Sequence, residues 1–190
     1  SLLIDIQERM RQGKGPAYER WAKVYNLKQM AAALQYLKEH QLFEYDDLTA
    51  KTDAATEHFH TLAGDIQQTE AELSRVSDLM AAVVQYAKTR PVFDGYKAAK
   101  YSRKYLAEHE AELADYRAVK ATMAELLGGE KLPKMDVLKE KRRQLAARKK
   151  ALYLEYRKAQ QDMRELVAVK GSVNHLRGLT DNQRNKEQAR

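Results

Sequence analysis

The chain has 190 residues, of which 32% are charged, with a formal net charge of +7 and no cysteine. Only eight glycines and three prolines occur, which favours helices over a core built from sheets. The absence of cysteine excludes a disulfide scaffold and a thiolate metal site, and the longest run without a polar residue, residues 79–84, is far shorter than the roughly 20 apolar residues of a membrane-spanning helix.

Residues 1–45 are predicted to form short helices. Residues 2–12 have apolar side chains at helical spacing, and the sequence Gly-Lys-Gly-Pro that comes next ends this helix. A second helix, residues 17–39, has an apolar stripe at spacings of three and four: Trp21, Val24, Leu27, Met30, Leu34 and Leu37. Because the chain starts inside an amphipathic pattern, we expect it to be a fragment of a longer protein.

Residues 46–87 carry a seven-residue repeat that predicts a long helix with a coiled-coil seam. One row of the repeat is Leu48, Ala55, Leu62, Thr69, Val76 and Val83, and the other is Thr52, Phe59, Ile66, Leu73, Met80 and Ala87. Asp46 or Asp47 suits the N-cap of this helix. We expect the helix to end near Lys88, because Pro91 disfavours helical geometry at the residue before it and lacks a backbone donor.

The connection after this helix is predicted as an irregular or short helical segment over residues 90–101. Ser102 then suits the cap of a helix over residues 102–127, which Gly128 and Gly129 end. A second long helix is expected from about Met135 to Leu176. Its apolar row is Leu138, Leu145, Leu152, Ala159, Leu166 and Val173, while the companion row is apolar only at Tyr156 and Met163.

The two long segments carry opposite charge, −6 over residues 46–87 and +6 over residues 136–170, which favours pairing between them. We therefore predict an elongated all-α fold with two long antiparallel coiled-coil-like helices and shorter helices packed at the ends. In this scheme residues 1–45 form the short helices, 46–178 the hairpin with its intervening helix, and 179–190 a disordered tail.

The triplet His58-Phe59-His60 resembles a metal-binding pattern, but the expected geometry argues against that role. Such a triplet binds a metal when it lies on a strand, where residues i and i+2 share a face; on a helix they point about 200° apart. Phe59 belongs to the seam, so the two imidazoles flank a buried side chain. With no glycine-rich phosphate loop or paired general acid and base, we expect no catalytic residue, metal or cofactor in this fragment.

Positive charge gathers in two clusters. The first cluster lies in residues 139–150, where Glu140 is the one acidic residue. Two of its members, Arg142 and Lys149, occupy the companion row of the second long helix. These side chains either pair with the acidic helix or bind phosphates, and pairing is slightly favoured. The first cluster consists of Lys139, Lys141, Arg142, Arg143, Arg148, Lys149 and Lys150.

The second cluster mixes cations with aromatic rings around the connection at residues 90–101. Rings and cations together are typical of a groove for single-stranded nucleic acid, and they also suit a cap that closes the end of a hairpin. The cap is slightly favoured. As candidate contacts we take Lys88, Arg90, Tyr96, Lys97, Lys100, Tyr101, Arg103, Lys104 and Tyr105.

Several ordered segments resemble relaxases, the mobilisation nucleases of conjugative elements in Gram-positive bacteria. They are residues 18–30 (YERWAKVYNLKQM), 89–90 with 96–97, 101–109 (YSRKYLAEH), and 155–159 with 163–166. The resemblance covers most of residues 3–178 and lies in the part of those proteins that comes after the nuclease domain. It implies that the catalytic tyrosine and metal-binding histidines belong to a preceding domain, and that His58 and His60 do not inherit the metal role.

The resemblance implies an accessory, non-catalytic helical domain of a relaxase, working in the bacterial cytoplasm in plasmid or transposon transfer. Its partners would be transfer-origin DNA, other relaxosome proteins or the coupling machinery. The alternative is a dimerisation or protein-interaction coiled coil without nucleic-acid contact, for which the polar seam positions Thr52 and Thr69 leave room. We expect no membrane contact.

Overall fold

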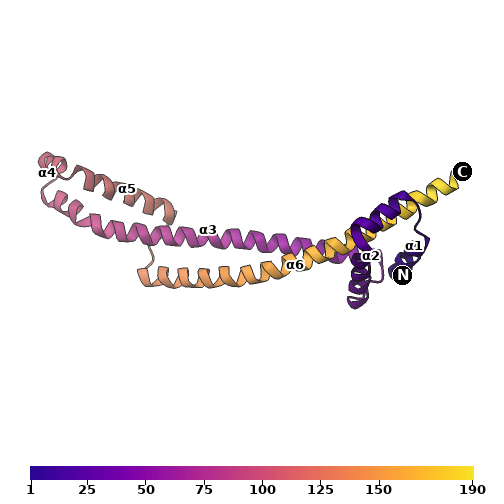
Figure 1. The fold of residues 1–190 in the computed structure, drawn as a ribbon. Helices are drawn as coiled ribbons and strands as arrows, with labels where there is room; N and C mark the ends of the chain where they lie inside the picture. The colour runs from indigo at the N-terminus through magenta and orange to yellow at the C-terminus, as the bar shows by residue number, and fades with distance from the viewer. The chain divides into compact units, whose positions relative to one another are not determined.

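The computed structural model describes residues 1–23 and 27–190, and every regular element in that part is an α-helix (Figure 1). The predicted position of Val24 in an apolar stripe lies outside the described residues. The helices are α1 (Leu2–Gln12), α2 (Pro16–Glu39), α3 (Tyr45–Ala98), α4 (Arg103–Glu108), α5 (Glu110–Leu127) and α6 (Met135–Gln188). The prediction of an all-α fold with two long helices is confirmed, since α3 and α6 have 54 residues each.

The chain forms two compact units, and both contain part of α3 and part of α6. Unit 1 comprises residues 1–63 and 154–190, and unit 2 comprises residues 64–153. The unit boundaries fall inside the long helices, whereas the sequence pattern divides the chain near residues 45 and 178. Within unit 1, Phe59 stacks on Tyr156 and Tyr45 donates a hydrogen bond to Asn174, so α3 and α6 run antiparallel there.

Unit 1 has an apolar core to which four helices contribute. Leu48 of α3, Leu37 of α2 and Val173 of α6 are fully buried in it, together with Ile6 of α1. Burying an aliphatic side chain of this size contributes roughly 1.5–3 kcal/mol each, so these contacts hold the short helices against the long ones. Trp21, Met30 and Leu37 of the predicted stripe therefore pack in one core with α6, whereas Leu27, predicted in the same stripe, is 54% exposed.

The last turns of α6 are tied to α1 through a buried arginine. Arg9 is 7% exposed and donates to the hydroxyl of Thr180 (2.6 Å) and to the carboxylate of Asp181 (2.8 Å), and its Nε donates to Asp5 (2.9 Å). These bonds offset the desolvation of the guanidinium and fix the segment after residue 178. The segment predicted as a disordered tail is helical in this structure as far as Gln188.

The seam positions behave as the repeat predicts along most of α3. Thr52 and Thr69 are buried, and their hydroxyls donate to the carbonyls of Leu48 (2.7 Å) and Asp65 (2.8 Å). The hydroxyls at these two polar seam positions are therefore satisfied within α3. Ala87 departs from the pattern because it is exposed.

Unit 2 contains two packed interfaces on α3. Val76 and Met80 pack against Leu138 and Leu145 of α6, whereas Ala82 packs against α5. Figure 1 shows α5 on one side of α3 and α6 on the other. From about Leu79 onward, α3 buries a second row of side chains, which includes Ala82, against α5. This change of buried face explains the exposure of Ala87.

The expected end of α3 near Lys88 is wrong, since the helix continues through Pro91 to Ala98. Pro91 removes one backbone hydrogen bond, but the next turn is held by tertiary contacts. Phe93 stacks on Tyr116 of α5 with ring centroids 4.4 Å apart, and Tyr86 stacks on the same ring at 5.5 Å. Packing of these aromatic rings outweighs the local preference to stop.

The intervening helix is divided into α4 and α5 at His109, whose backbone leaves the helical region (φ −122°, ψ 26°). The predicted cap is confirmed, because Ser102 accepts a hydrogen bond from the amide of Tyr105 (3.4 Å). Gly128 adopts a left-handed conformation (φ 56°) and ends α5 as expected.

Candidate nucleic-acid interface

The rotation of α6 in unit 2 is set by its buried leucines. Leu138 and Leu145 face α3, so residues four before and four after Leu145 lie on the two flanks of the interface. Lys141 Nζ lies 3.0 Å from Glu72, and Lys149 Nζ lies 3.5 Å from Glu70. Because Glu70 and Glu72 point about 160° apart on α3, the two ion pairs close opposite sides of the interface.

Glu70 is the better held of the two acids. It accepts a hydrogen bond from the hydroxyl of Tyr153 (2.7 Å) in addition to its pair with Lys149. This hydrogen bond, followed by the charge of Lys149, lowers the pKa of Glu70 below its ordinary value. The acid is therefore ionised at neutral pH and neutralises its lysine within the chain.

The predicted pairing of the first cluster with the acidic helix applies to two of its seven residues, Lys141 and Lys149. Arg143 pairs within α6, at 2.6 Å from Glu140, which raises the pKa of Arg143 and lowers that of Glu140. Within residues 1–23 and 27–190, the remaining cations make no ion pair: Lys139, Arg142, Arg148 and Lys150.

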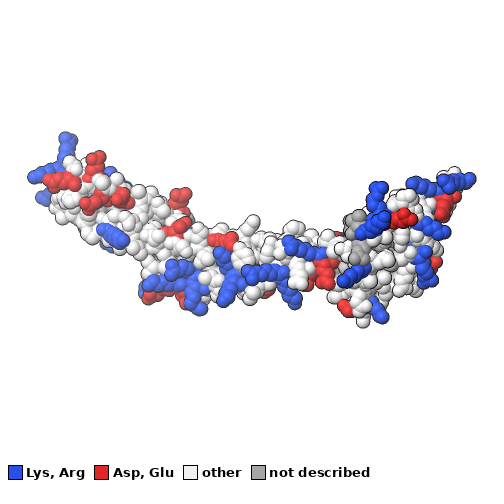
Figure 2. Space-filling model, viewed as in Figure 1, with Lys and Arg blue, Asp and Glu red and all other residues white. Residues whose placement is uncertain are grey.

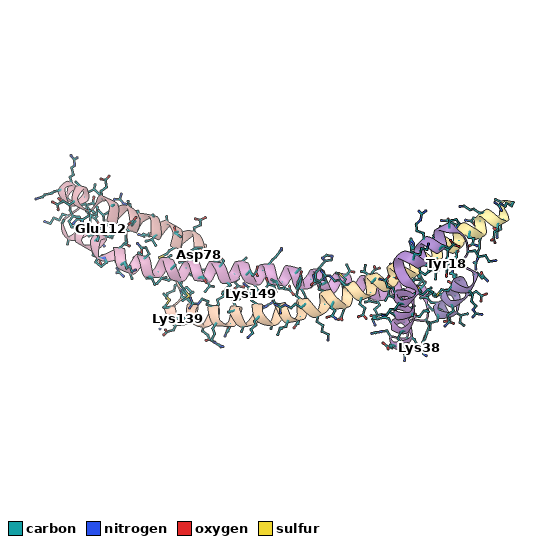
Figure 3. All side chains as sticks on the ribbon, in the orientation of Figure 1. Tyr18, Lys38, Asp78, Glu112, Lys139 and Lys149 are labelled. Carbon is teal, nitrogen blue, oxygen red and sulfur yellow. The ribbon has the colours of Figure 1, made fainter. Side chains whose placement is uncertain are left out.

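Four cations of the first cluster share one exposed face of α6, which we call the basic face: Lys139, Arg142, Arg143 and Lys150. At 100° per residue they fall within an arc of roughly 100°, and about 17 Å of helix separates the first from the last. Arg148 points about 160° away from Lys150 and lies outside this face. Figure 2 shows Lys and Arg side chains along the α6 edge, and Figure 3 labels Lys139 in the first turns of α6.

The second cluster lies where α3 ends and α4 begins, and most of its rings are used internally. Tyr96 contacts Tyr105 with ring centroids 5.9 Å apart, and the hydroxyl of Tyr105 donates to the carbonyl of Val92 (2.8 Å). Tyr101, by contrast, is 57% exposed. Tyr96 and Tyr105 are therefore packed within the end of the hairpin, as the cap interpretation expects, while the ring of Tyr101 faces solvent.

The cations of the second cluster are all exposed: Lys88, Arg90, Lys97, Lys100, Arg103 and Lys104. Arg90 lies 3.8 Å from Asp94, and Lys97 Nζ lies 5.8 Å from the ring centroid of Phe93. The other four form no ion pair in the part of the chain that the structure describes. Their charge is thus available to an anionic partner.

The histidine triplet lies on α3 in the arrangement that the repeat predicts. Phe59 is half-buried and stacks on Tyr156, with 4.9 Å between the ring centroids, while His58 and His60 are exposed. Among the described residues, three or more His, Cys, Asp or Glu side chains do not come together in a way that could hold a metal ion.

Sequence reasoning missed two residues that shape these surfaces. Tyr153 comes one helical turn after Lys149, and this i, i+4 spacing is the signal that would have placed both side chains on one face of α6. Gly95 permits the close approach of Tyr105, because a Cβ at Gly95 would clash with the tyrosine hydroxyl. Only the folded chain reveals this second requirement.

Comparison of the chain with protein-family models, with curated proteins and with solved structures gives no match. None of the helices, over the residues that the structure describes, combines the length and apolarity needed to cross a membrane. The function of the chain is therefore inferred from its residues and their geometry.

Proposed function

We propose that this chain is a non-catalytic helical module that binds DNA through the basic face of α6. In this proposal it acts as an accessory domain of a bacterial relaxase-type mobilisation protein, in the cytoplasm. The resemblance of residues 18–30, 89–90 with 96–97, 101–109, and 155–159 with 163–166 to relaxases supplies the candidate ligand, which is transfer-origin DNA. Relaxosome or coupling proteins are additional candidate partners for the rest of the surface.

The single observation that carries the proposal is the division of charge on α6. Lys141 and Lys149 face α3 and are neutralised by Glu72 and Glu70. Around α6, Lys139, Arg143 and Lys150 point about 80–120° away from Lys149, whereas Arg142, in the same row as Lys149, is exposed at the edge of the interface beside Met80 and Ala81 of α3. The only ion-pair partner of these four cations among the described residues is Glu140 on the same helix. Three of the four, Lys139, Arg142 and Lys150, have no ion pair among the described residues, so a multivalent anion bound along the helix is the natural counterpart.

Nucleic acid fits this arrangement better than an acidic protein does. Duplex DNA carries about one negative charge per 1.7 Å of axis, so an α6 segment of roughly 17 Å runs beside several phosphates. The cations are long, exposed side chains on a regular helix, and recognition of phosphates requires no preformed pocket. Binding of this kind is expected to be largely independent of sequence.

The proposal is tested by removing the charge of the basic face and comparing a matched control. The face variant carries Lys139→Gln, Arg142→Gln, Arg143→Gln and Lys150→Gln. The control variant loses the same charge at exposed positions off the face, with Arg148→Gln, Lys158→Gln, Lys186→Gln and Arg190→Gln. Glutamine is nearly as good a helix former as lysine or arginine, so both variants should fold.

The affinity of each variant for a labelled duplex is then measured by fluorescence anisotropy at one salt concentration. We expect the face variant to lose at least about tenfold in affinity, and the control variant to lose only the small part that its lower net charge causes. Equal losses in the two variants would show that net charge alone attracts DNA, and would overturn the proposed interface.

A further inference from the structure

The turn between α3 and α4 has an unusual backbone. Lys100 (φ 53°) and Tyr101 (φ 58°) both adopt the left-handed conformation, which side chains other than glycine rarely take. The amide of Tyr101 donates to the carbonyl of Tyr96 (3.0 Å), and that of Lys100 donates to Lys97 (2.9 Å). These two bonds form a Schellman motif, in which glycine usually occupies the place of Lys100.

The turn presents the ring of Tyr101 to solvent on a rigid support. Tyr101 is 57% exposed, and its ring meets that of Tyr96 edge to face, with centroids 5.2 Å apart and an interplanar angle of 88°. Tyr96 in turn contacts Tyr105, which is anchored to Val92 by a hydrogen bond of 2.8 Å. The supporting rings hold the exposed ring in one orientation.

Exposed cations lie close to this ring in the sequence. Lys97, Lys100, Arg103 and Lys104 lie within four residues of Tyr101, and no acid occurs between Asp94 and Glu108. None of the four forms an ion pair with another described residue. An oriented aromatic face with exposed cations before and after it in the chain suits an unpaired base with flanking phosphates.

We infer that this turn binds a single-stranded segment of nucleic acid, with an unpaired base stacked on Tyr101 and its flanking phosphates held by Lys97, Lys100, Arg103 and Lys104. The inference rests on the proposed function and deepens it, because it names the form of the ligand. In a duplex the base faces are covered by neighbouring base pairs, so the ring of Tyr101 is complementary to an unpaired base only.

The experiment uses the full chain and an oligonucleotide of about 16 nucleotides, the upper end of a single-strand site, containing the fluorescent base 2-aminopurine. Stacking on an aromatic ring quenches this fluorophore. Two variants are compared: Tyr101→Phe, which keeps the ring, and Tyr101→Leu, which keeps an apolar contact with Tyr96 but has no aromatic face. Thermal unfolding measured in parallel verifies that both variants fold as the parent does.

We expect Tyr101→Leu to weaken single-strand binding by about tenfold and to abolish the quenching, while duplex binding is unchanged. Tyr101→Phe should retain both signals. Unchanged single-strand affinity and quenching in Tyr101→Leu would overturn the inference, and so would an equal loss toward the single strand and the duplex.

Failure of this inference is distinguishable from failure of the proposed function. The face variant of α6 is measured against the same two ligands. If the face variant loses duplex binding while Tyr101→Leu behaves as the parent, the result supports the basic face and rejects the single-strand site at Tyr101. If the face variant binds duplex as tightly as its control, the proposed function is rejected, whatever the result with Tyr101→Leu.

Discussion

Tyr153 on α6 donates a hydrogen bond to Glu70 on α3, with 2.7 Å between the two oxygens, and Lys149 Nζ lies 3.5 Å from the same carboxylate. Lys150, the next residue after Lys149, belongs to the exposed basic face. Two adjacent lysines therefore have different roles, because a step of 100° around α6 moves the side chain from the interface to solvent.

The bond between Tyr153 and Glu70 gives unit 2 a stability that depends on pH. The pKa of Glu70 is lower in the folded chain than its ordinary value of 4.5, so the bond stabilises the fold above that pH and the contribution disappears as the pH falls through the folded pKa. Tyr153→Phe should therefore lower the melting temperature at pH 7. The difference from the parent should shrink steadily below pH 4.5, as calorimetry at a series of pH values would show; a difference that grows in acid would contradict this assignment.

Replacing Arg9 should release the C-terminal turns of α6. Arg9→Ala removes the bonds to Asp5, Thr180 and Asp181. We expect the free energy of unfolding to fall by about 1–2 kcal/mol, because the carboxylates of Asp5 and Asp181 are partly exposed. Limited proteolysis should then cut after Arg177 faster than in the parent. Gln7→Ala, an exposed change on the same helix, is the control and should leave the rate of cleavage after Arg177 unchanged.

Pro91 should be replaceable with a gain in stability. Because α3 is helical on both sides of Pro91, Pro91→Ala restores a donor to a continuous helix and should raise the free energy of unfolding by about 1–3 kcal/mol. Urea unfolding followed by circular dichroism measures the change. A loss of stability would mean that the proline ring itself is needed in the packing around Phe93.

Glycine at the two left-handed helix ends should also stabilise the chain. Lys100 (φ 53°) and Gln41 (φ 54°) occupy equivalent positions after α3 and α2. In both cases the amide of the next residue donates a hydrogen bond to a carbonyl in the last turn of the helix, which completes the Schellman motif. Lys100→Gly and Gln41→Gly should each add about 1 kcal/mol to the free energy of unfolding, measured in urea. Ala147, exposed in the interior of α6, supplies the contrast, because Ala147→Gly should destabilise by a similar amount.

The seam of α6 was predictable because a seven-residue apolar row records burial directly: Leu138, Leu145 and Leu166 are all buried as expected. The end of α3 was not predictable, because stacking of Phe93 on Tyr116 joins residues distant in sequence and outweighs the local effect of Pro91. The same holds for the C-terminal turns of α6, which depend on Arg9 at the other end of the chain.

Which cations remain exposed could be predicted only in part. The repeat placed Arg142 and Lys149 in the companion row, yet Lys141 and Lys149 are the pair that flanks Leu145 and reaches the acids. The positions of Glu72 and Glu70 on α3 decide this, and they depend on the register between the two helices, which neither repeat specifies alone. The exposed orientation of Tyr101 likewise depends on a left-handed turn without a glycine to signal it.

The salt dependence of duplex binding tests the central claim, phosphate contact by the basic face of α6, most directly. Each phosphate contact contributes about 0.9 to the slope of log affinity against log salt concentration, so loss of the four cations should reduce the magnitude of that slope by roughly 3–4. The control variant should keep a slope within about 1 of the parent. Equal slopes for the face variant and the parent would show that Lys139, Arg142, Arg143 and Lys150 do not contact DNA.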